Sequence, residues 1–537
     1  MTIFFWGVII SVLIYLVVGL WAGRRVKDTS DYYVCGRNAP TLLITGTLFA
    51  SMLSVSGFTG DQGWCYSGNI TSLVLLNAIC ACGYVFGALV FGRYLRRSEC
   101  STMPEYFGTR FHDVRNRQVA GGITVISLTA YLLSSITGVG ILMEELTGLP
   151  GWVCLLITWV CFTGFTFYSG SEGVVITDTM MFLVFFAATL FSGYYIFRAQ
   201  GGIGKLLPNL MANPAAPEGL LDYHGRVKSA RAEGVVDSLS YALTMGIVWF
   251  ITVAVSPWQA GRNLMAKSEH VTFRAGSLAA IFTVVFLLYL NLQSIAVLNV
   301  NPALEDPQRV LIWASLNVTP KLVGTLMLTG IMAAGLSSAS TFLSVMGFSV
   351  VLDLIPRHAG DDKKSLRLSR YAMLGISVIV LGLSFLGLGG IREVCYFAST
   401  IIAASWAVPA IGSILSSKLS AAGARWAMIA GFLGFIVSKV LAEANVMSLG
   451  SILINFLDPF FIGLYLSLIF AVVGSRMYPV TQAETNYRME LLKTPKAEAV
   501  PCEYQKDRRY GYLMILAGVA TSLLLLFGWA LPYNGWM

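Results

Sequence analysis

The sequence is poor in charged residues. Only 12% of its 537 residues are Asp, Glu, Lys or Arg, whereas soluble domains carry about a quarter. Hydrophobic residues make up 56% of the chain, and the mean hydropathy is +0.71. This composition excludes an ordinary soluble protein and predicts a protein that crosses a membrane many times.

Three further absences limit the function. The nine cysteines are scattered without metal-site spacing, so we expect neither a metal centre of that kind nor a disulfide framework. All four histidines lie in predicted loops, which argues against a histidine relay within the membrane. No His, Cys or paired carboxylates converge at membrane depth, so we predict that the chain is not an enzyme.

Long apolar segments are abundant, and about fourteen of them could cross a bilayer. Basic residues follow the first segment and no small-residue cleavage site is present, so we expect a membrane span there rather than a signal peptide. The predicted spans cover residues 3–23, 41–66, 71–93, 118–146, 151–169, 173–198, 235–256, 272–298, 319–354, 367–388, 392–416, 424–442, 450–474 and 511–531.

The distribution of Lys and Arg predicts the orientation of these spans. With both termini outside the cell, about three quarters of the 36 basic residues lie in loops on the cytoplasmic side. The net charge of +8 therefore reflects membrane orientation, and we expect no nucleic-acid partner. On this assignment no Lys or Arg lies at mid-membrane. The predicted location is the cell membrane, with lipid as the surrounding partner.

One span contains a dense group of small and hydroxyl residues, TGIMAAGLSSASTFL at 329–343. In a helix, Ala334, Ser337, Ser338 and Thr341 share one face. Hydroxyl oxygens are ligands for hard cations, while alanine and glycine allow a second backbone to approach closely. An ion site and a tight helix contact are both consistent with this pattern.

Two spans are predicted to be discontinuous. The second contains FASMLSVSGFTG, and the seventh contains Gly246 and then Ser256-Pro257. Broken helices at membrane depth are tolerated where they line a cavity, and matched breaks in two halves indicate the binding site of a secondary transporter. The two breaks lie five spans apart, so the second half is inverted relative to the first.

Asp178 is the acidic residue that the sequence places within a span, about one turn from its start. An ionisable group at that depth is a functional candidate, and the alternative is an acid that stabilises the start of its helix. On the predicted topology it has no Lys or Arg at its own depth.

Five motifs in sequence order resemble the sodium:solute symporter family, whose members carry sugars, proline, pantothenate, monocarboxylates and sialic acid. TMPEYFGTRF at Thr102–Phe111 is similar to the family's T-x-P-E-Y…R-F motif. The other four motifs are DYYVCGRNAP at Asp31–Pro40, GSEGVVITDTMM, GRNLMAKS at Gly261–Ser268 and AAGLSSAS. The resemblance covers about residues 3–474.

The resemblance implies an all-α membrane fold with a LeuT-like core of two inverted five-helix repeats. We expect an extra N-terminal helix and loop at 1–40, the first repeat at 41–198 and an extracellular loop at 199–234. The second repeat follows at 235–416, with accessory helices at 417–474, a cytoplasmic linker at 475–510 and a last helix at 511–537.

The resemblance also implies sodium as the coupling ion. The first sodium site would use the backbone carbonyls of Ala50, Leu53 and Ala334 and the hydroxyls of Ser337 and Ser338. A second sodium, bound by some family members, would use Asp178 with Ser337, Ser340 and Thr341. Neutral oxygen ligands suit a monovalent cation better than Mg²⁺.

The substrate would lie between the two broken helices and the third, fourth and eleventh spans. The residues predicted to line that cavity are Ser54, Ser56, Gly57, Asn77, Tyr131, Ser135, Trp249 and Thr252. Sugar carriers have Asn and an aromatic gate where this chain has Trp249 and Thr252, and the expected topology offers no arginine for sialic acid. These departures argue against a hexose and a sialic acid.

We therefore predict a sodium-coupled symporter that imports a small organic solute by alternating access, without an obligate protein partner. Proton coupling through Asp178 is the alternative within transport. A transporter-like membrane sensor is the alternative from another class, although the 475–510 segment is too short for a signalling domain.

Overall fold

The computed structural model describes residues 3–23, 29–226, 234–355, 362–387, 389–444 and 457–535. Within these ranges the chain is helical, with no strand beyond an isolated bridge between Ala39 and Ala266. Eleven helices are long and apolar enough to cross a membrane, and three shorter apolar helices cover 3–19, 41–52 and 151–167. The all-α membrane prediction is confirmed, while the count of fourteen spans stays a prediction.

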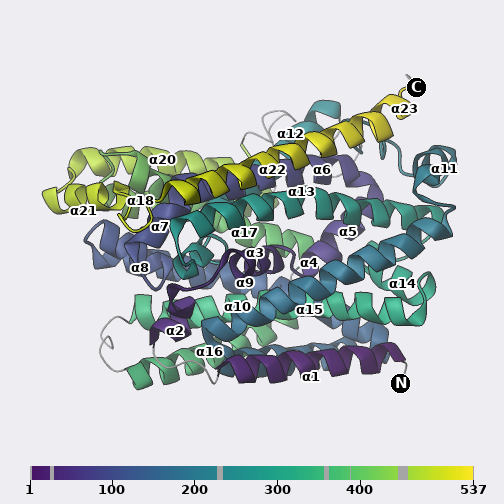
Figure 1. The fold of residues 1–537 in the computed structure, drawn as a ribbon, viewed down its shortest axis with the longest axis horizontal. Helices are drawn as coiled ribbons and strands as arrows, with labels where there is room; N and C mark the ends of the chain where they lie inside the picture. Colours follow the sequence, from purple (N-terminus) through teal and green to yellow (C-terminus); the bar gives the residue numbers. More distant parts are fainter. Residues whose placement is uncertain are drawn as a thin grey trace.

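The helices pack side by side in a single bundle (Figure 1). In chain order they are α1 (Ile3–Gly23), α2 (Thr29–Val34), α3 (Thr41–Met52), α4 (Val55–Phe58), α5 (Gly60–Trp64), α6 (Ile70–Gly87), α7 (Arg93–Ser98), α8 (Met103–Arg110), α9 (Val114–Thr147), α10 (Gly151–Ala199), α11 (Leu206–Ala212), α12 (Val235–Val255), α13 (Glu269–Val300), α14 (Val310–Asn317), α15 (Lys321–Phe348), α16 (Asp362–Ser384), α17 (Ile391–Leu415), α18 (Ala421–Glu443), α20 (Pro459–Met477), α21 (Gln482–Leu492), α22 (Pro501–Leu525) and α23 (Leu531–Tyr533).

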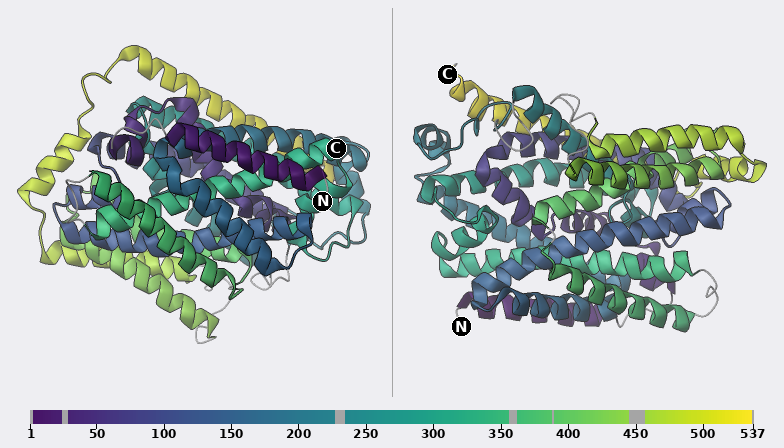
Figure 2. Two further views of the ribbon diagram at one scale, coloured as in Figure 1. Left: turned by 90° about the horizontal axis from the view of Figure 1, so that it is seen from below. Right: turned by 180° about the vertical axis from the view of Figure 1, so that it is seen from behind.

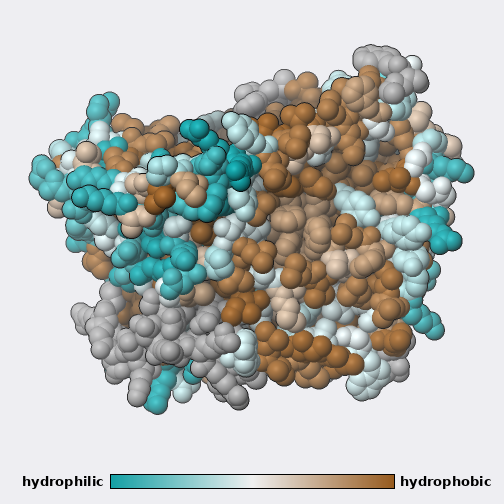
Figure 3. All heavy atoms as spheres, in the orientation of Figure 1, coloured by the Kyte–Doolittle hydropathy of each residue, from teal (hydrophilic) through white to brown (hydrophobic). Residues whose placement is uncertain are grey.

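The long helices run roughly along the horizontal axis of Figure 1, and both chain ends lie at the same end of the molecule. Figure 2 shows the same alignment from below and from behind. Hydrophobic residues cover the middle of the face in Figure 3, and hydrophilic residues gather at its two ends. This arrangement fits a bilayer around the middle of the bundle, with the helix axes crossing it.

Helix α15 lies at the centre of the bundle. All of its residues from Met327 to Ser344 are buried. Its glycines lie against neighbouring helices: a Cβ added at Gly330 would lie 3.1 Å from the Phe185 backbone, and one at Gly335 would lie 2.3 Å from Val139. Small residues thus allow α10 and α9 to approach the hydroxyl-rich part of α15 closely.

The predicted break in the second span is confirmed. Helix α3 ends at Met52, Leu53 and Ser54 leave the helical region with ψ angles of 70° and 176°, and the short α4 follows. The Ser54 amide bonds to the Met52 carbonyl instead of the Ala50 carbonyl four residues earlier. The Ala50 carbonyl therefore loses the partner that an uninterrupted helix would give it.

The seventh span breaks at only one of the two predicted places. Helix α12 continues through Gly246, where a Cβ would lie 2.6 Å from Ile79 of α6, so this glycine serves close packing. The helix stops before Ser256-Pro257, because proline has no amide hydrogen and disfavours a helical residue before it. A single 3-10 turn, η5 (Ala260–Met265), follows.

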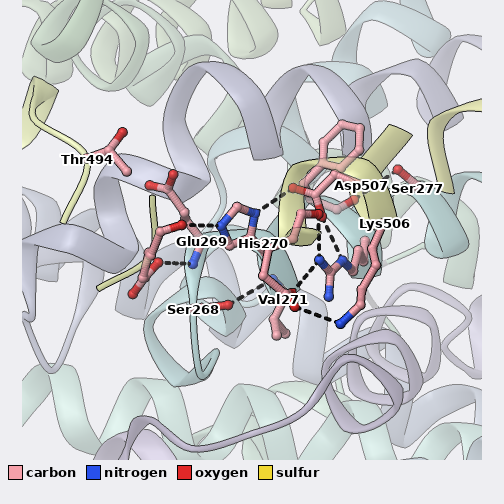
Figure 4. A network of polar contacts seen from close by, with 12 residues as sticks. Ser268, Glu269, His270, Val271, Ser277, Thr494, Lys506 and Asp507 are labelled. Carbon is pink, nitrogen blue, oxygen red and sulfur yellow. Dashed lines mark hydrogen bonds and ion pairs between the residues drawn. The ribbon is translucent and has the colours of Figure 1, made fainter. Parts of the chain in front are cut away.

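The last helix, α22, is held to the start of α13 by a polar network (Figure 4). His270 pairs with Asp507 at 2.6 Å, and Arg274 contacts Asp507 and Glu503, each at 2.6 Å. The Glu498 carboxylate accepts a bond from the Glu269 amide at 2.8 Å. His270 therefore lies in the first turn of a helix and contacts Asp507, and its predicted loop position is wrong.

Candidate functional site

Asp178 on α10 is fully buried and joins three other elements. Its Oδ2 accepts a hydrogen bond from Thr47 of α3 at 2.6 Å, and its Oδ1 accepts one from Ser337 of α15 at 2.7 Å. Thr341 of α15 lies 3.5 Å from Oδ2. A buried carboxylate with several hydrogen bonds is an interior binding group rather than an acid at a helix start.

Arg262 corrects a prediction about this acid. It lies in η5, only 3% exposed, with its Nη2 atom 3.3 Å from Asp178 Oδ2. The same nitrogen donates to the Thr341 hydroxyl. The prediction that Asp178 has no Lys or Arg at its own depth is therefore wrong. It failed because η5 folds back into the bundle instead of remaining outside it.

The residues predicted for the first sodium ion lie on two elements that pack together. Ala334, Ser337 and Ser338 lie on α15, and Ala50 and Leu53 flank the end of α3; all five are buried. The Ser338 hydroxyl oxygen has no hydrogen-bond partner among the described residues. Such an oxygen is available as a ligand, as is the Ala50 carbonyl freed by the helix break.

The residues predicted for a second sodium ion are only partly brought together. Ser337 and Thr341 contact Asp178, whereas the Ser340 hydroxyl donates to the Ser337 carbonyl at 2.9 Å, one turn earlier on its own helix. The Arg262 guanidinium lies between Asp178 and Thr341. A cationic group of the protein therefore lies beside two of these four residues.

Six residues predicted to bind the solute gather in one place with two that were not predicted, Cys395 and Ser399. We call this group the central cluster, and its predicted members are Ser54, Ser56, Gly57, Tyr131, Trp249 and Thr252. Ser56 donates to Cys395 at 3.5 Å, and Thr252 donates to the Ser399 carbonyl at 3.3 Å. The Tyr131 ring is 6.5 Å from the Trp249 ring. The cluster thus joins α4, α9, α12 and α17.

Two predicted residues do not join these contacts. Asn77 lines a separate apolar groove of about 580 Å³ between α6, α13 and α22. The Ser135 hydroxyl donates to the Tyr131 carbonyl of its own helix at 3.3 Å. The central cluster therefore draws on α17, the predicted eleventh span, whereas Asn77 of α6, the predicted third span, lies outside these contacts.

Three residues of this region were missed from the sequence. Arg262 was assigned to a cytoplasmic loop because it follows Pro257. Cys395 and Ser399 were not named, although their i, i+4 spacing in the eleventh span puts both on one helix face. That spacing was an available signal, whereas no local pattern indicates that η5 enters the bundle.

Comparison with known proteins identifies the family of the chain. Residues 32–431 match the family model described as the Sodium:solute symporter family. The chain belongs to the sodium:solute symporter family. It is 24% identical over 480 residues to the osmoregulated proline transporter OpuE of Bacillus subtilis (strain 168), covering 86% of this chain and 94% of that protein. Family membership assigns the chain to sodium-coupled solute symport.

Solved structures show the fold. A Na⁺-coupled sialic acid symporter, solved in a substrate-bound outward-open state, matches with a TM-score of 0.72 and 16% identity, over 90% of this chain and 99% of that one. Mhp1, a nucleobase-cation-symport-1 family transporter in a closed conformation, matches with a TM-score of 0.56 and 12% identity, over 86% and 99%. The predicted LeuT-like transporter fold is therefore confirmed.

Proposed function

We propose that this chain imports a small organic solute across the cell membrane together with sodium, with both termini outside. Two observations support the orientation: the termini lie at one end of the molecule, and most basic residues lie in loops predicted for the opposite side. An inside-negative potential then favours sodium entry by about 2.3 kcal/mol per charge at 100 mV.

Two observations on neighbouring helices carry the proposal, the break at the end of α3 and the unengaged hydroxyl of Ser338 on α15. The helix break frees the Ala50 carbonyl, and the buried Ser338 hydroxyl oxygen lacks a partner among the described residues. With Leu53, Ala334 and Ser337 these groups form the proposed sodium site. Because sodium joins α3 to α15, its binding would stabilise one arrangement of the two repeats.

The central cluster is the proposed solute site, and its side chains suit a small solute without net charge. Hydroxyl, aromatic and thiol groups line it, and the buried Arg262 is paired with Asp178 elsewhere. Proline is the first solute to test because the relative OpuE is named as a proline transporter. We propose no enzymatic activity and no obligate protein partner.

Proton coupling through Asp178 is the weaker alternative. A guanidinium 3.3 Å from the carboxylate favours its ionised form, and so do the hydrogen bonds from Ser337 and Thr47. The sensor alternative also gains no support, since α21 and the start of α22 pack on the transporter itself.

The test is uptake into proteoliposomes containing the purified chain. An inward sodium gradient should drive uptake of one solute from a panel of proline, other amino acids, monocarboxylates and sugars. The Ser337→Ala/Ser338→Ala variant should lose sodium stimulation while it still folds and unfolds cooperatively. Uptake that follows a pH gradient without sodium, or full sodium stimulation in the double variant, would reject the proposal.

A matched control is Ser377→Ala on α16. This hydroxyl donates to the Leu374 carbonyl of its own helix at 2.8 Å. Its removal deletes the same atom from a membrane helix without touching the proposed site. Sodium stimulation should stay at the wild-type level in this variant.

A further inference from the structure

Arg262 lies where a second cation would have to bind. Its Nη2 atom is 3.3 Å from Asp178 Oδ2 and donates to Thr341. Asp178 and Thr341 are the acid and one of the hydroxyls that a second sodium ion would use. The side chains of Arg262 and Asp178 are 4% and 0% exposed, so bulk solvent screens their charges little.

One nearby cation is sufficient to compensate the charge of a buried carboxylate. Arg262 already supplies a full positive charge, and the hydrogen bonds from Thr47 and Ser337 satisfy further lone pairs of Asp178. A sodium ion at the same carboxylate would lie within a few ångströms of the guanidinium. Repulsion between two like charges is strong at that distance in a weakly polarisable interior.

The backbone around Arg262 holds the guanidinium at this depth. The Ala39 amide bonds to the Met265 carbonyl at 3.1 Å, and the Lys267 amide bonds to the Ala39 carbonyl at 3.0 Å. Arg96 donates to the Lys267 carbonyl at 3.1 Å. The end of η5 is thus attached to the segment that leads into α3. These bonds fix the backbone near Arg262, so the fold holds the guanidinium near Asp178 in addition to the contacts of the side chain itself.

The first sodium site is compatible with this ion pair. Ser337 donates its hydroxyl hydrogen to Asp178, which leaves the oxygen lone pairs for a cation on the other side. The Ser338 oxygen is likewise unengaged among the described residues. The contacts of Arg262 with Asp178 and Thr341 therefore leave the ligands of the first site untouched.

We infer that the Arg262 guanidinium is a built-in cation at Asp178 that excludes a second sodium ion, so each solute molecule travels with one sodium ion. This inference rests on the proposed function, because it concerns the stoichiometry of the same symport. Arg262 is here a specificity-determining residue: it fixes how many ions the transporter takes.

The test is equilibrium binding of radioactive sodium to the purified full-length chain in nanodiscs, in choline buffer. The wild type should bind one ion per chain, and Arg262→Lys, which keeps a tethered cation, should also bind one. Arg262→Gln should bind two, because Asp178 then lacks its partner. Arg262→Gln/Asp178→Asn should return to one, and the control Arg425→Gln, which removes a guanidinium that pairs with Asp113 outside this site, should stay at one.

Two ions bound by the wild type would overturn the inference, and so would a count of one in folded Arg262→Gln. If Arg262→Gln does not fold, the wild type and the Arg262→Gln/Asp178→Asn variant, which loses both charges together, still decide the question. A drop from two ions to one between them would show a second site at Asp178. Absence of sodium binding in the wild type would instead reject the proposed function.

Discussion

Ser337 on α15 donates a hydrogen bond to Asp178 on α10 across 2.7 Å, with both side chains fully buried. This bond joins a predicted ligand of the first sodium ion to the acid that pairs with Arg262. The proposed sodium site, the carboxylate and η5 are therefore joined by a continuous series of polar contacts. A change of charge at Asp178 should therefore alter the sodium affinity, although the carboxylate is not among the five predicted ligands of the first sodium ion.

The first prediction tests this series of contacts with Asp178→Asn. The variant keeps the shape but leaves the Arg262 charge unopposed near the sodium site. We expect the half-saturating sodium concentration to rise about tenfold, equivalent to about 1.4 kcal/mol. The measurement is solute uptake at saturating solute across a range of sodium concentrations.

The matched control is the Arg262→Gln/Asp178→Asn variant, which removes both charges. It should restore most of the sodium affinity, because the unpaired charge is gone, and the single and double variants form a cycle that isolates the coupling. Equal sodium dependence in the wild type and Asp178→Asn would mean that the carboxylate does not act on the sodium site.

Features that depend on local composition were predictable from the sequence. Length and hydropathy identified the apolar helices, and the crowded Gly and Ser residues identified the break between α3 and α4. The placement of Arg262 was not predictable, because hydropathy assigns a basic residue after Pro257 to a loop. It results from tertiary pairing between Ala39 and the end of η5.

Only part of the central cluster was predictable from the sequence, because its composition also depends on tertiary packing. Helical spacing indicates which residues share a face, as with Cys395 and Ser399 on α17. Which face meets the site depends on how the helices pack, and hydrophobic periodicity is weak in a helix surrounded by apolar neighbours. Asn77 on α6 was named from the resemblance to sugar carriers, and no residue was named on the eleventh span, α17, which supplies the contacts with Ser56 and Thr252.

The second prediction concerns closure of the central cluster from outside. Arg392, at the start of α17, pairs with Asp61 of α5 at 3.3 Å and lies 3.8 Å from the centre of the Trp64 ring. Arg392→Gln removes an ion pair and a cation–π contact that together contribute about 1–2 kcal/mol. We expect a membrane-impermeant maleimide to label the buried Cys395, one turn further on, about tenfold faster.

Labelling is measured on intact cells by mass spectrometry of the peptide that contains Cys395. Cys395→Ser in the same background should abolish the signal. Arg309→Gln, which breaks outer ion pairs with Glu144 and Glu145, should leave it unchanged. Wild-type labelling rates in Arg392→Gln would show that the Asp61–Arg392 pair does not close this route.

The third prediction compares two glycines. A Cβ added at Gly83 of α6 would lie 2.4 Å from the Phe250 carbonyl oxygen of α12, whereas one at Gly164 of α10 would meet nothing within 4 Å. Gly83→Ala should force these helices apart and lower the free energy of unfolding by about 1–3 kcal/mol.

The measurement is thermal unfolding of the purified protein in one detergent. Gly164→Ala is the control and should be neutral or stabilising, by up to about 1 kcal/mol, since alanine favours a helix over glycine. An unchanged melting temperature in Gly83→Ala would mean that α6 and α12 are less closely packed than the Gly83–Phe250 approach indicates.

The last prediction separates two residues proposed for the solute site. Trp249 lies 6.5 Å from Tyr131 in the central cluster, whereas Asn77 lines the apolar groove beside α22. Trp249→Ala removes a large contact surface, so the half-saturating solute concentration should rise about tenfold or more, since an aromatic side chain contributes at least 1.4 kcal/mol when buried. Asn77→Leu preserves volume in an apolar setting and should leave that concentration unchanged. Uptake at saturating sodium gives the half-saturating solute concentration of each variant. The half-saturating sodium concentration should be the same in both variants as in the wild type. A raised solute constant in Asn77→Leu would place α6 in the site, and an unchanged one in Trp249→Ala would remove α12 from it.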